Sequence, residues 1–194
     1  MKKTKGRNRV LPLLLAAGLL VFGVFAFQRL KPDVEKAVYP RHYREIVERE
    51  AKAFGLEDHL VYAVIKAESG FRKNAVSSAG ALGLMQMTPG TFEWMQTHLG
   101  GPCKEEDLFD PAVSIRFGCG LLRLLLDEYG SLPVALSAYN AGMGNVTSWL
   151  SDPACSPDGV TLTHIPFAET RLYVERVLRY KATYDQIYGG MENG

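Results

Sequence analysis

The sequence is poor in the residues that build metal centres and disulfide frameworks. Its 194 residues include only three cysteines, Cys103, Cys119 and Cys155, with no C-x-x-C pair, and its four histidines are scattered. This pattern does not predict a metal site. Two interpretations of the cysteines stay open. One is a single disulfide with one thiol left over, as an oxidising compartment allows, and the other is three free, partly buried thiols.

The chain also lacks an excess of basic charge. It carries 22 Lys and Arg residues against 21 Asp and Glu residues. Five of the basic residues precede an apolar run, so residues 28–194 hold 17 basic and 21 acidic side chains, a formal charge of −4. A nucleic-acid-binding domain usually presents a basic surface, and nothing here resembles one. We therefore expect no nucleic-acid partner.

The apolar run, residues 10–27, contains no charged side chain. It is about long enough to span a bilayer as a helix. Because its basic flank lies only on the N-terminal side, the positive-inside rule places residues 1–9 in the cytoplasm as a basic tail and the remaining chain outside. The alternative is a cleavable signal peptide with its cleavage site at 24–26, although the run is long for a signal-peptide core. Both interpretations predict an extracytoplasmic domain, either tethered to the cell membrane in a single pass or secreted.

Strand signals are scarce, and residues 160–165 offer only a modest candidate. Residues 28–39 resemble a short linker, and helical signals dominate after it. A hydrophobic content of 47% suits one globular domain with its own core. We therefore predict a mainly α single domain at 40–188, followed by a flexible tail at 189–194.

Residues typical of helix starts set most of the predicted boundaries. Asp58 is an N-cap candidate, and Thr88-Pro89 and Asp110-Pro111 each place a capping side chain before a proline at the first helical position. The predicted helices cover residues 41–54, 58–68, a segment from 89, 111–129, 131–141, 144–150 and 166–188. Loops are expected at 72–87 and 151–164.

Glu68 stands out as a charged residue on an apolar helix face. Val61, Val64 and Ile65 precede it by seven, four and three residues, and these separations place side chains on one face of a helix. Burial without a charged partner raises the pKa of a carboxyl, and a carboxyl still protonated near neutral pH can act as a general acid. The alternative is a core carboxyl that is paired with Arg or Lys.

Glu68 belongs to the first of four stretches that have to be considered together. These stretches are residues 68–71, 80–90, 138–142 and 165–174. In this order, at these separations and in a helical chain, they resemble the catalytic domain of the soluble-type lytic transglycosylases, enzymes with a lysozyme-like fold that cleave peptidoglycan. The resemblance covers about residues 40–188, and it implies a lysozyme-like domain. The cysteines and the loop that contains Cys155 depart from the family pattern.

The resemblance implies a site built around Glu68 as the single catalytic acid. Ser69 follows it as in the family and would support the carboxyl or the substrate. Met85 and Gln86 match the loop that lines the sugar cleft. Taken alone, however, a methionine in a helical protein is more often core filler.

The two later motifs imply the remaining substrate-binding residues. Tyr139 and Asn140 match the motif beside the catalytic acid, and Glu169 and Tyr173 match the last motif at the start of the final helix. Each also has a structural alternative. Tyr139 could be a core aromatic residue, Asn140 could belong to an ordinary helix end, and Glu169 could only complement the dipole of its helix.

The chemistry that the resemblance implies needs one carboxyl and neither cofactor nor metal. The acid protonates the glycosidic oxygen of the β-1,4 bond between N-acetylmuramic acid and N-acetylglucosamine. It then acts as a base towards the C6 hydroxyl of the muramic acid, which closes on C1 and leaves a 1,6-anhydro end. The N-acetyl group of the muramic acid assists as an internal nucleophile. The expected partner is therefore the peptidoglycan glycan strand.

Two other functions stay open. A hydrolase on the same fold, such as a goose-type lysozyme, would leave a reducing end and would need a second acid, for which only residues 105–107 offer candidates. A non-catalytic wall-binding module is the other alternative. The presence of Glu68 argues against it, because a domain that no longer catalysed a reaction would be free to lose its acid.

Overall fold

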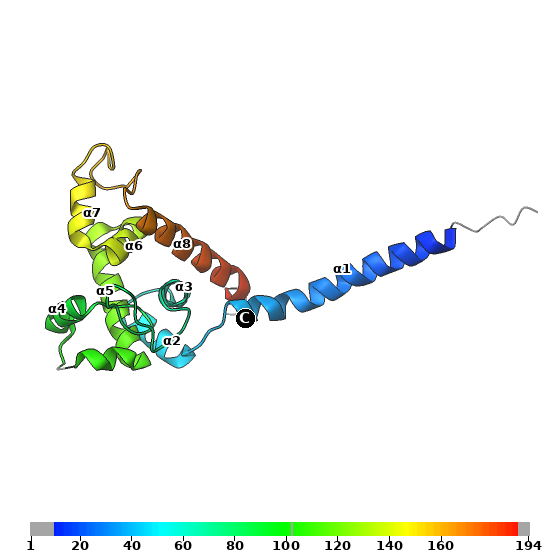
Figure 1. The fold of residues 1–194 in the computed structure, drawn as a ribbon, viewed down its shortest axis with the longest axis horizontal. Helices are drawn as coiled ribbons and strands as arrows, with labels where there is room; N and C mark the ends of the chain where they lie inside the picture. The colour runs from blue at the N-terminus through cyan, green and yellow to red at the C-terminus, as the bar shows by residue number, and fades with distance from the viewer. Residues whose placement is uncertain (1–9, 102, 190–194) are drawn as a thin grey trace, which may run out of the picture. The chain divides into compact units, whose positions relative to one another are not determined.

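A computed structural model describes residues 10–101 and 103–189 (Figure 1). The chain divides into two compact units, Met1–Pro40 and Arg41–Gly194. The predicted basic tail at 1–9 lies outside the described residues, as does nearly all of the predicted C-terminal tail.

The described part of the first unit is a helix, α1, which spans Val10–Val38. The segment expected to be a linker is therefore helical as far as Val38, and Pro32 lies inside the helix. An ion pair of 3.5 Å between Lys31 and Glu35, one turn apart, supports this part of the helix. Among the described residues, no helix meets the length and apolarity that crossing a membrane requires.

The second unit is helical, as predicted. Its elements are α2 (Arg44–Ala53), α3 (Asp58–Glu68), α4 (Pro89–Leu99), the 3₁₀ helix η1 (Glu105–Phe109), α5 (Pro111–Tyr129), α6 (Leu132–Ala141), α7 (Met143–Leu150) and α8 (Ala168–Tyr188). Extended pairing within the described ranges is limited to single bridges, which join Leu82 to Val76 and to Met87 in the loop before α4.

From Leu60 to Ile65, helix α3 is apolar on every side and is buried accordingly. Every residue from His59 to Ile65 is buried, and the helix packs against α2 and α8. The apolar face predicted from helical spacing is confirmed, because Val61, Val64 and Ile65 have no exposed surface. Glu68 is the last residue of this helix, so the buried helix determines where its carboxyl lies.

Helices α5 and α8 make most of the contacts that hold the other helices together. Helix α5 packs against α2, α4, η1 and α6, and α8 packs against α3 and α6. Figure 1 shows α8 continuing from the long loop after α7 and running beside α6. The three segments that follow α3 in the predicted site are thereby carried by the loop before α4, by α6 and by α8.

The start signals for α4 and α5 are confirmed. The Thr88 hydroxyl accepts a hydrogen bond of 3.3 Å from the backbone N–H of Thr91, with Pro89 as the first helical residue. The Asp110 carboxylate accepts hydrogen bonds from two backbone N–H groups at 2.8 and 3.2 Å, again with proline in first position. Both caps satisfy N–H groups that have no partner inside the helix.

Other predicted starts were wrong by one to three residues. Helix α2 begins at Arg44 rather than Arg41, after Tyr43 with its left-handed backbone. Glu57, not Asp58, is the N-cap of α3, and it makes no capping hydrogen bond through its side chain. Asp58 is the first helical residue, because its carboxylate accepts a hydrogen bond of 2.8 Å from the N–H of His59 and also binds Arg41. The last helix begins at Ala168 rather than Pro166, because Phe167 keeps an extended backbone.

The strand candidate at residues 160–165 was also wrong. The Asp158 carboxylate accepts hydrogen bonds from the N–H groups of Val160 and Thr161, at 2.9 and 2.7 Å. These bonds close a turn, and a strand would need the same N–H groups for pairing. They also lower the pKa of Asp158 to about 2.

The three cysteines do not pair with one another. Cys103 is half-buried, and Cys119 and Cys155 are buried, all as free thiols. Of the two open interpretations, the structure therefore has three free thiols.

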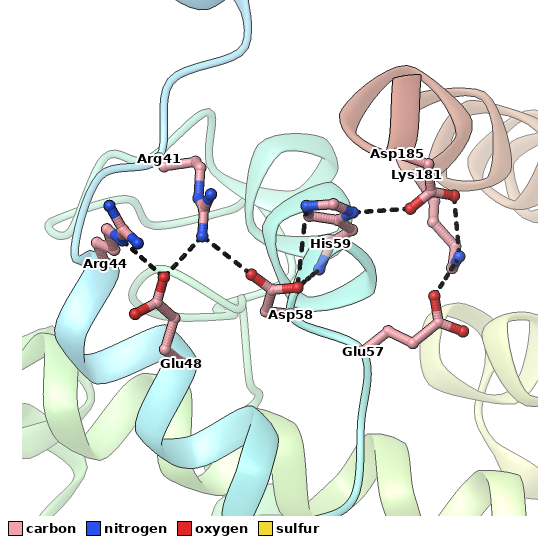
Figure 2. A network of polar contacts seen from close by, with 8 residues as sticks. All are labelled: Arg41, Arg44, Glu48, Glu57, Asp58, His59, Lys181 and Asp185. Carbon is pink, nitrogen blue, oxygen red and sulfur yellow. Dashed lines mark hydrogen bonds and ion pairs between the residues drawn. The ribbon is translucent and has the colours of Figure 1, made fainter. Parts of the chain in front are cut away.

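Charged side chains hold the beginning of α3 against α2 (Figure 2). Arg41 donates to Glu48 on α2 at 2.6 Å and to Asp58 on α3 at 3.2 Å. Arg44 also contacts Glu48 at 2.6 Å. The side chain of Arg41 is largely buried, so this bridge is screened less than an ordinary surface ion pair.

A second set of ion pairs in Figure 2 holds the beginning of α3 against the end of α8. The Nδ1 atom of His59 lies 2.8 Å from Asp185, and Lys181 bridges Asp185 and Glu57 at 3.0 and 2.6 Å. The two sets fix one end of α3, and Glu68 lies at the opposite end of the same helix.

Gly83 fixes the loop between α3 and α4 against the core. Its φ of +76° lies in the left-handed region, and an added Cβ would overlap the Leu108 carbonyl and lie 2.9 Å from the Ser114 hydroxyl. Gly80 has a similar φ of +78°, but an added Cβ there would meet nothing within 4 Å. The two glycines therefore separate the effect of backbone conformation from that of close packing.

Replacing Gly83 by Ala should destabilise the protein more than replacing Gly80 by Ala. Both variants should lose about 1–2 kcal/mol because of the left-handed backbone. Gly83→Ala should lose roughly a further 1–3 kcal/mol through overpacking against η1 and α5. Urea denaturation of the two variants beside the wild type would measure the difference, and equal losses would contradict the role of close packing.

Candidate active site

Glu68 lies where α3 ends and the chain turns into a loop. Ser69 caps the helix through its N–H, which donates to the Ile65 carbonyl at 3.0 Å, and Gly70 follows with a φ of +58°. The next residue, Phe71, is also left-handed, with a φ of +65°. The chain therefore turns sharply after Glu68, and the carboxyl remains at the end of the buried helix.

Burial raises the pKa of the Glu68 carboxyl to about 7. Hydrogen bonding by Tyr173 and the positive charge of Arg176 act in the opposite direction, and the negative charge of Glu169 adds to the increase. The C-terminal end of a helix dipole also disfavours a negative charge. Near neutral pH the carboxyl is therefore protonated in a large fraction of molecules, and it can both give and accept a proton.

Two tyrosines from different helices lie beside this carboxyl. Burial raises the pKa of Tyr173 on α8 and of Tyr139 on α6, and the charge of Glu68 raises both further. The Tyr139 hydroxyl donates a hydrogen bond of 2.9 Å to the Met85 carbonyl. The Tyr173 hydroxyl is buried and lies close enough to Glu68 for hydrogen bonding that lowers the pKa of the carboxyl, although this contact is longer or less well aligned than a standard hydrogen bond. Both phenols remain neutral donors beside the acid.

Gln86 approaches the site from the loop before α4. Its backbone is left-handed, with a φ of +49°, which is uncommon for a residue other than glycine. The side-chain amide nitrogen donates to the carbonyls of Ala75 and Gly83, at 3.1 and 2.9 Å. These bonds tie the strained residue to both sides of its loop, and strain of this kind is concentrated at functional sites.

Glu68 and Gln86 line the same cavity, which has a volume of about 460 Å³. Its other walls come from the turn after α3 and from the loop that follows it. The lining residues are Glu68, Arg72, Asn74, Ala75, Val76, Ser77 and Gln86. The lining contains one carboxyl group, together with a guanidinium, two amides and a hydroxyl.

Two predicted site residues, Ser69 and Met85, are buried next to the lining residues Glu68 and Gln86 in the chain. The Ser69 hydroxyl is buried and donates to the Ile65 carbonyl at 3.2 Å. The Met85 side chain has no exposed surface, and its N–H donates to the Ser114 hydroxyl at 3.2 Å. Gly118 makes room for Met85, since a Cβ there would overlap the Met85 sulfur. In this structure both residues therefore contact the protein interior and do not line the cavity.

The remaining two predicted residues lie where α6 meets α8. The Asn140 side-chain oxygen accepts a hydrogen bond of 2.8 Å from the Thr170 hydroxyl, which joins the two helices. Glu169 is exposed in the first turn of α8, and its charge acts on Glu68. The structure therefore brings Glu68, Tyr139, Tyr173 and Glu169 into one electrostatic environment.

The basic residues of the site were not predicted from the sequence. Arg176 follows Tyr173 by three residues on α8, so helical spacing places both side chains on one face. This spacing could have suggested Arg176 from the sequence. Arg72 gave no such signal, because it belongs to an irregular turn in which its Nε donates to the Ser69 carbonyl at 2.9 Å. Among the described residues, no group of three His, Cys, Asp or Glu side chains is arranged to hold a metal ion.

Comparison with known proteins identifies the family. The model of the transglycosylase SLT domain matches residues 45–157, which is more than half of the chain. This chain belongs to the transglycosylase SLT family. A second model, that of the soluble lytic transglycosylase helical domain, matches residues 164–193. The SLT match includes the loop of Gln86 and the helices that carry Glu68 and Tyr139.

Relatives of this SLT domain are longer proteins. The chain is 33% identical over 159 residues to the soluble lytic murein transglycosylase of Escherichia coli, with 78% of this chain and 24% of that protein covered. It is 31% identical over 172 residues to the membrane-bound lytic murein transglycosylase C of Actinobacillus succinogenes, with 76% and 48% covered. The chain thus spans about a quarter to a half of the length of these relatives.

A solved structure supports the same fold. An inactive mutant of lytic transglycosylase Slt from Pseudomonas aeruginosa superposes with a TM-score of 0.68 at 35% sequence identity, covering 78% of this chain and 25% of that one. The prediction of a mainly helical, lysozyme-like domain is confirmed by this likeness together with the helices described above.

Removing the positive charge of Arg176 should raise the pKa of Glu68 in this SLT domain. The guanidinium favours the carboxylate, so Arg176→Gln should move the pKa from about 7 upward by roughly 0.5–1. Titration of the Glu68 carboxyl by ¹³C NMR, assigned with Glu68→Gln, would measure the change. The matched control is Arg179→Gln, an exposed arginine on the same helix that is not among the groups acting on Glu68. A fall in the pKa on removing Arg176 would contradict this assignment.

Proposed function

We propose that this chain is a peptidoglycan lytic transglycosylase that cleaves the β-1,4 bond between N-acetylmuramic acid and N-acetylglucosamine. The observation that carries this proposal is the Glu68 carboxyl, which has a pKa of about 7 and lies at the wall of a cavity without another carboxyl. Membership of the SLT family supports the substrate class. One group that titrates near neutrality can serve as acid and then as base.

In the proposed reaction, protonated Glu68 gives its proton to the glycosidic oxygen as the bond to C1 of the muramic acid breaks. The carboxylate then takes the proton of the C6 hydroxyl, whose oxygen bonds to C1 and closes the 1,6-anhydro ring. The proton lost in the first step is regained in the second, so Glu68 ends as it began. The neutral hydroxyl of Tyr173 supplies a donor that stabilises the carboxylate between the steps, whereas the hydroxyl of Tyr139 donates to the Met85 carbonyl.

A hydrolase on the same fold would need a second acid to activate water. Glu105, Glu106 and Asp107 belong to η1, and none of them lines the cavity of Glu68. Asp107 instead accepts a hydrogen bond of 2.7 Å from the N–H of Lys104. Glu169 acts on Glu68 but is exposed, and it also lies outside that lining. These placements favour transglycosylation, in which the substrate itself supplies the second nucleophile.

The products released from purified peptidoglycan test the proposal. The wild type should release muropeptides with 1,6-anhydro ends, and Glu68→Gln should release none, because an amide cannot transfer the proton. Mass spectrometry distinguishes these products from reducing-end muropeptides, which are heavier by one water. Reducing ends from the wild type would mean a hydrolase, and binding without release by either protein would mean a wall-binding module.

Thermal unfolding of Glu68→Gln is the control for an intact fold. The pKa of Glu68 is about 7 in the folded protein and near 4.5 as the reference value. The folded state therefore keeps the proton to a higher pH than the unfolded state does. The stability that this protonation contributes is complete below pH 4.5 and is lost as the pH rises to 7. The loss amounts to roughly 3 kcal/mol at most. The glutamine variant avoids it and should be at least as stable as the wild type at pH 8.

We infer that residues 10–27 tether the domain to the cell membrane with the catalytic domain outside the cytoplasm. The length of the apolar run and its basic N-terminal flank support this inference. A relative named as membrane-bound is consistent with it. The full chain should remain in the membrane fraction after a high-salt wash, and deletion of residues 1–27 should abolish that retention. A mature N-terminus near Phe27 in the medium would instead mean a cleaved signal peptide.

A further inference from the structure

Arg72 is the one basic side chain among the described residues that line the cavity of Glu68. The other polar side chains of this lining, apart from Glu68 itself, are Asn74, Ser77 and Gln86, and all three are neutral. Because the pKa of Glu68 is raised to about 7, its carboxyl is also uncharged in a large fraction of molecules near neutral pH. The positive charge of Arg72 is therefore only partly balanced within the cavity wall.

The guanidinium of Arg72 is held in place through one of its three nitrogens. Its Nε atom donates to the Ser69 carbonyl at 2.9 Å. The two terminal nitrogens form no hydrogen bond or ion pair with any other residue in the described ranges, and the residue is exposed to solvent. Arg72 is also not among the groups that shift the pKa of Glu68. Its terminal nitrogens are therefore left as a fork, which matches the two oxygens of a carboxylate.

Asn74 provides a second donor on the same wall. Its side-chain amide is exposed and makes no hydrogen bond to another described residue. In contrast, the amide nitrogen of Gln86 already donates to two backbone carbonyls, and the Ser77 hydroxyl accepts a hydrogen bond of 2.9 Å from the N–H of Ala81. The side-chain nitrogens that this wall leaves for a ligand are therefore those of Arg72 and Asn74, and both suit an anionic oxygen acceptor.

We propose that Arg72 is a specificity-determining residue, which binds a carboxylate on the branch that the muramic acid carries at its C3 oxygen. Without a peptide stem, this branch ends in the carboxylate of the lactyl group. With a stem attached, that carboxylate has become an amide, and the peptide supplies carboxylates of its own. N-acetylglucosamine has no such group, so binding of the carboxylate distinguishes the two sugars of the strand. This inference rests on the proposed function for the identity of the strand.

The size of the cavity and the charge of the domain agree with such a local contact. A volume of about 460 Å³ lies in the range of ligand pockets and leaves room for a branch beside the glycosidic bond. Residues 28–194 carry a formal charge of −4, so the domain as a whole does not attract an anionic strand. Attraction of a carboxylate therefore depends on the guanidinium that lies in the cavity wall.

Two pairs of glycan strands of equal length test the proposal with the full chain. The first pair is stem-free and carries the lactyl group either as the carboxylate or as its primary amide. The second pair carries peptide stems whose carboxylates are either free or converted into primary amides. An amide has nearly the size of a carboxylate but no charge. In at least one pair, KM should be roughly three- to ten-fold higher for the amide, and that pair identifies the source of the carboxylate.

Variants of Arg72 assign this preference to its side chain. Arg72→Gln should have the same KM for both members of the pair, because glutamine has no charge. Arg72→Lys should keep part of the preference, since lysine retains the charge without the planar fork. The matched control is Lys73→Gln, which removes the same charge from the adjacent exposed residue outside the cavity lining and should keep the full preference. Because each comparison is made within one protein, a general loss of activity in a variant affects both substrates equally.

Three results would overturn the proposal. They are equal KM values within both pairs for the wild type, a preference that Arg72→Gln leaves unchanged, and a preference that Lys73→Gln abolishes as fully as Arg72→Gln does. Absence of anhydro ends from every strand would instead contradict the proposed function. In that case the dissociation constants of the same pairs, measured with Glu68→Gln in place of KM, would still test the role of Arg72.

Discussion

The position of one carboxyl group depends on a helix that is buried on every side. Helix α3 packs against α2 and α8, and its last residue, Glu68, lies at the wall of a cavity. Burial raises the pKa of that carboxyl to about 7, and the C-terminal end of the helix adds to the cost of a negative charge. Among the neighbouring groups, Glu169 raises this pKa further, whereas Tyr173 and Arg176 lower it.

Helix α8 acts on both ends of α3. Near its C-terminal end, Asp185 and Lys181 bind His59 and Glu57 at the beginning of α3 (Figure 2). Near its N-terminal end, Tyr173 and Arg176 lower the pKa of Glu68. Because one rigid helix carries both sets of contacts, a shift of α8 along its axis would disturb the anchoring of α3 and the acidity of Glu68 together. The same register places Thr170 against Asn140 on α6.

Much of the fold and part of the site could be predicted from local signals. The capping residues Thr88 and Asp110, each followed by a proline, predicted the helix starts correctly. The spacing of Val61, Val64 and Ile65 predicted the buried helix face that precedes Glu68. Predictions failed where a side chain competed for backbone N–H groups. Asp158 closes a turn where a strand was expected, and Asp58 binds the N–H of His59 inside the first turn rather than capping the helix. Such competition depends on side-chain rotamers, which residue type alone does not determine.

The sequence by itself determined the helical architecture and the family motifs, because these follow from periodicity, helix caps and residue type. It also singled out Glu68 as the candidate acid, through its apolar helix face and the resemblance of its motif. Only the tertiary structure decided which groups surround that acid. It buried Met85 and Ser69 next to residues of the cavity lining and brought Arg176 and two tyrosines to Glu68. These arrangements arise from contacts between α3, α6 and α8, which are far apart in the chain. A pKa depends on such neighbours and on burial, and neither is a property of the local sequence.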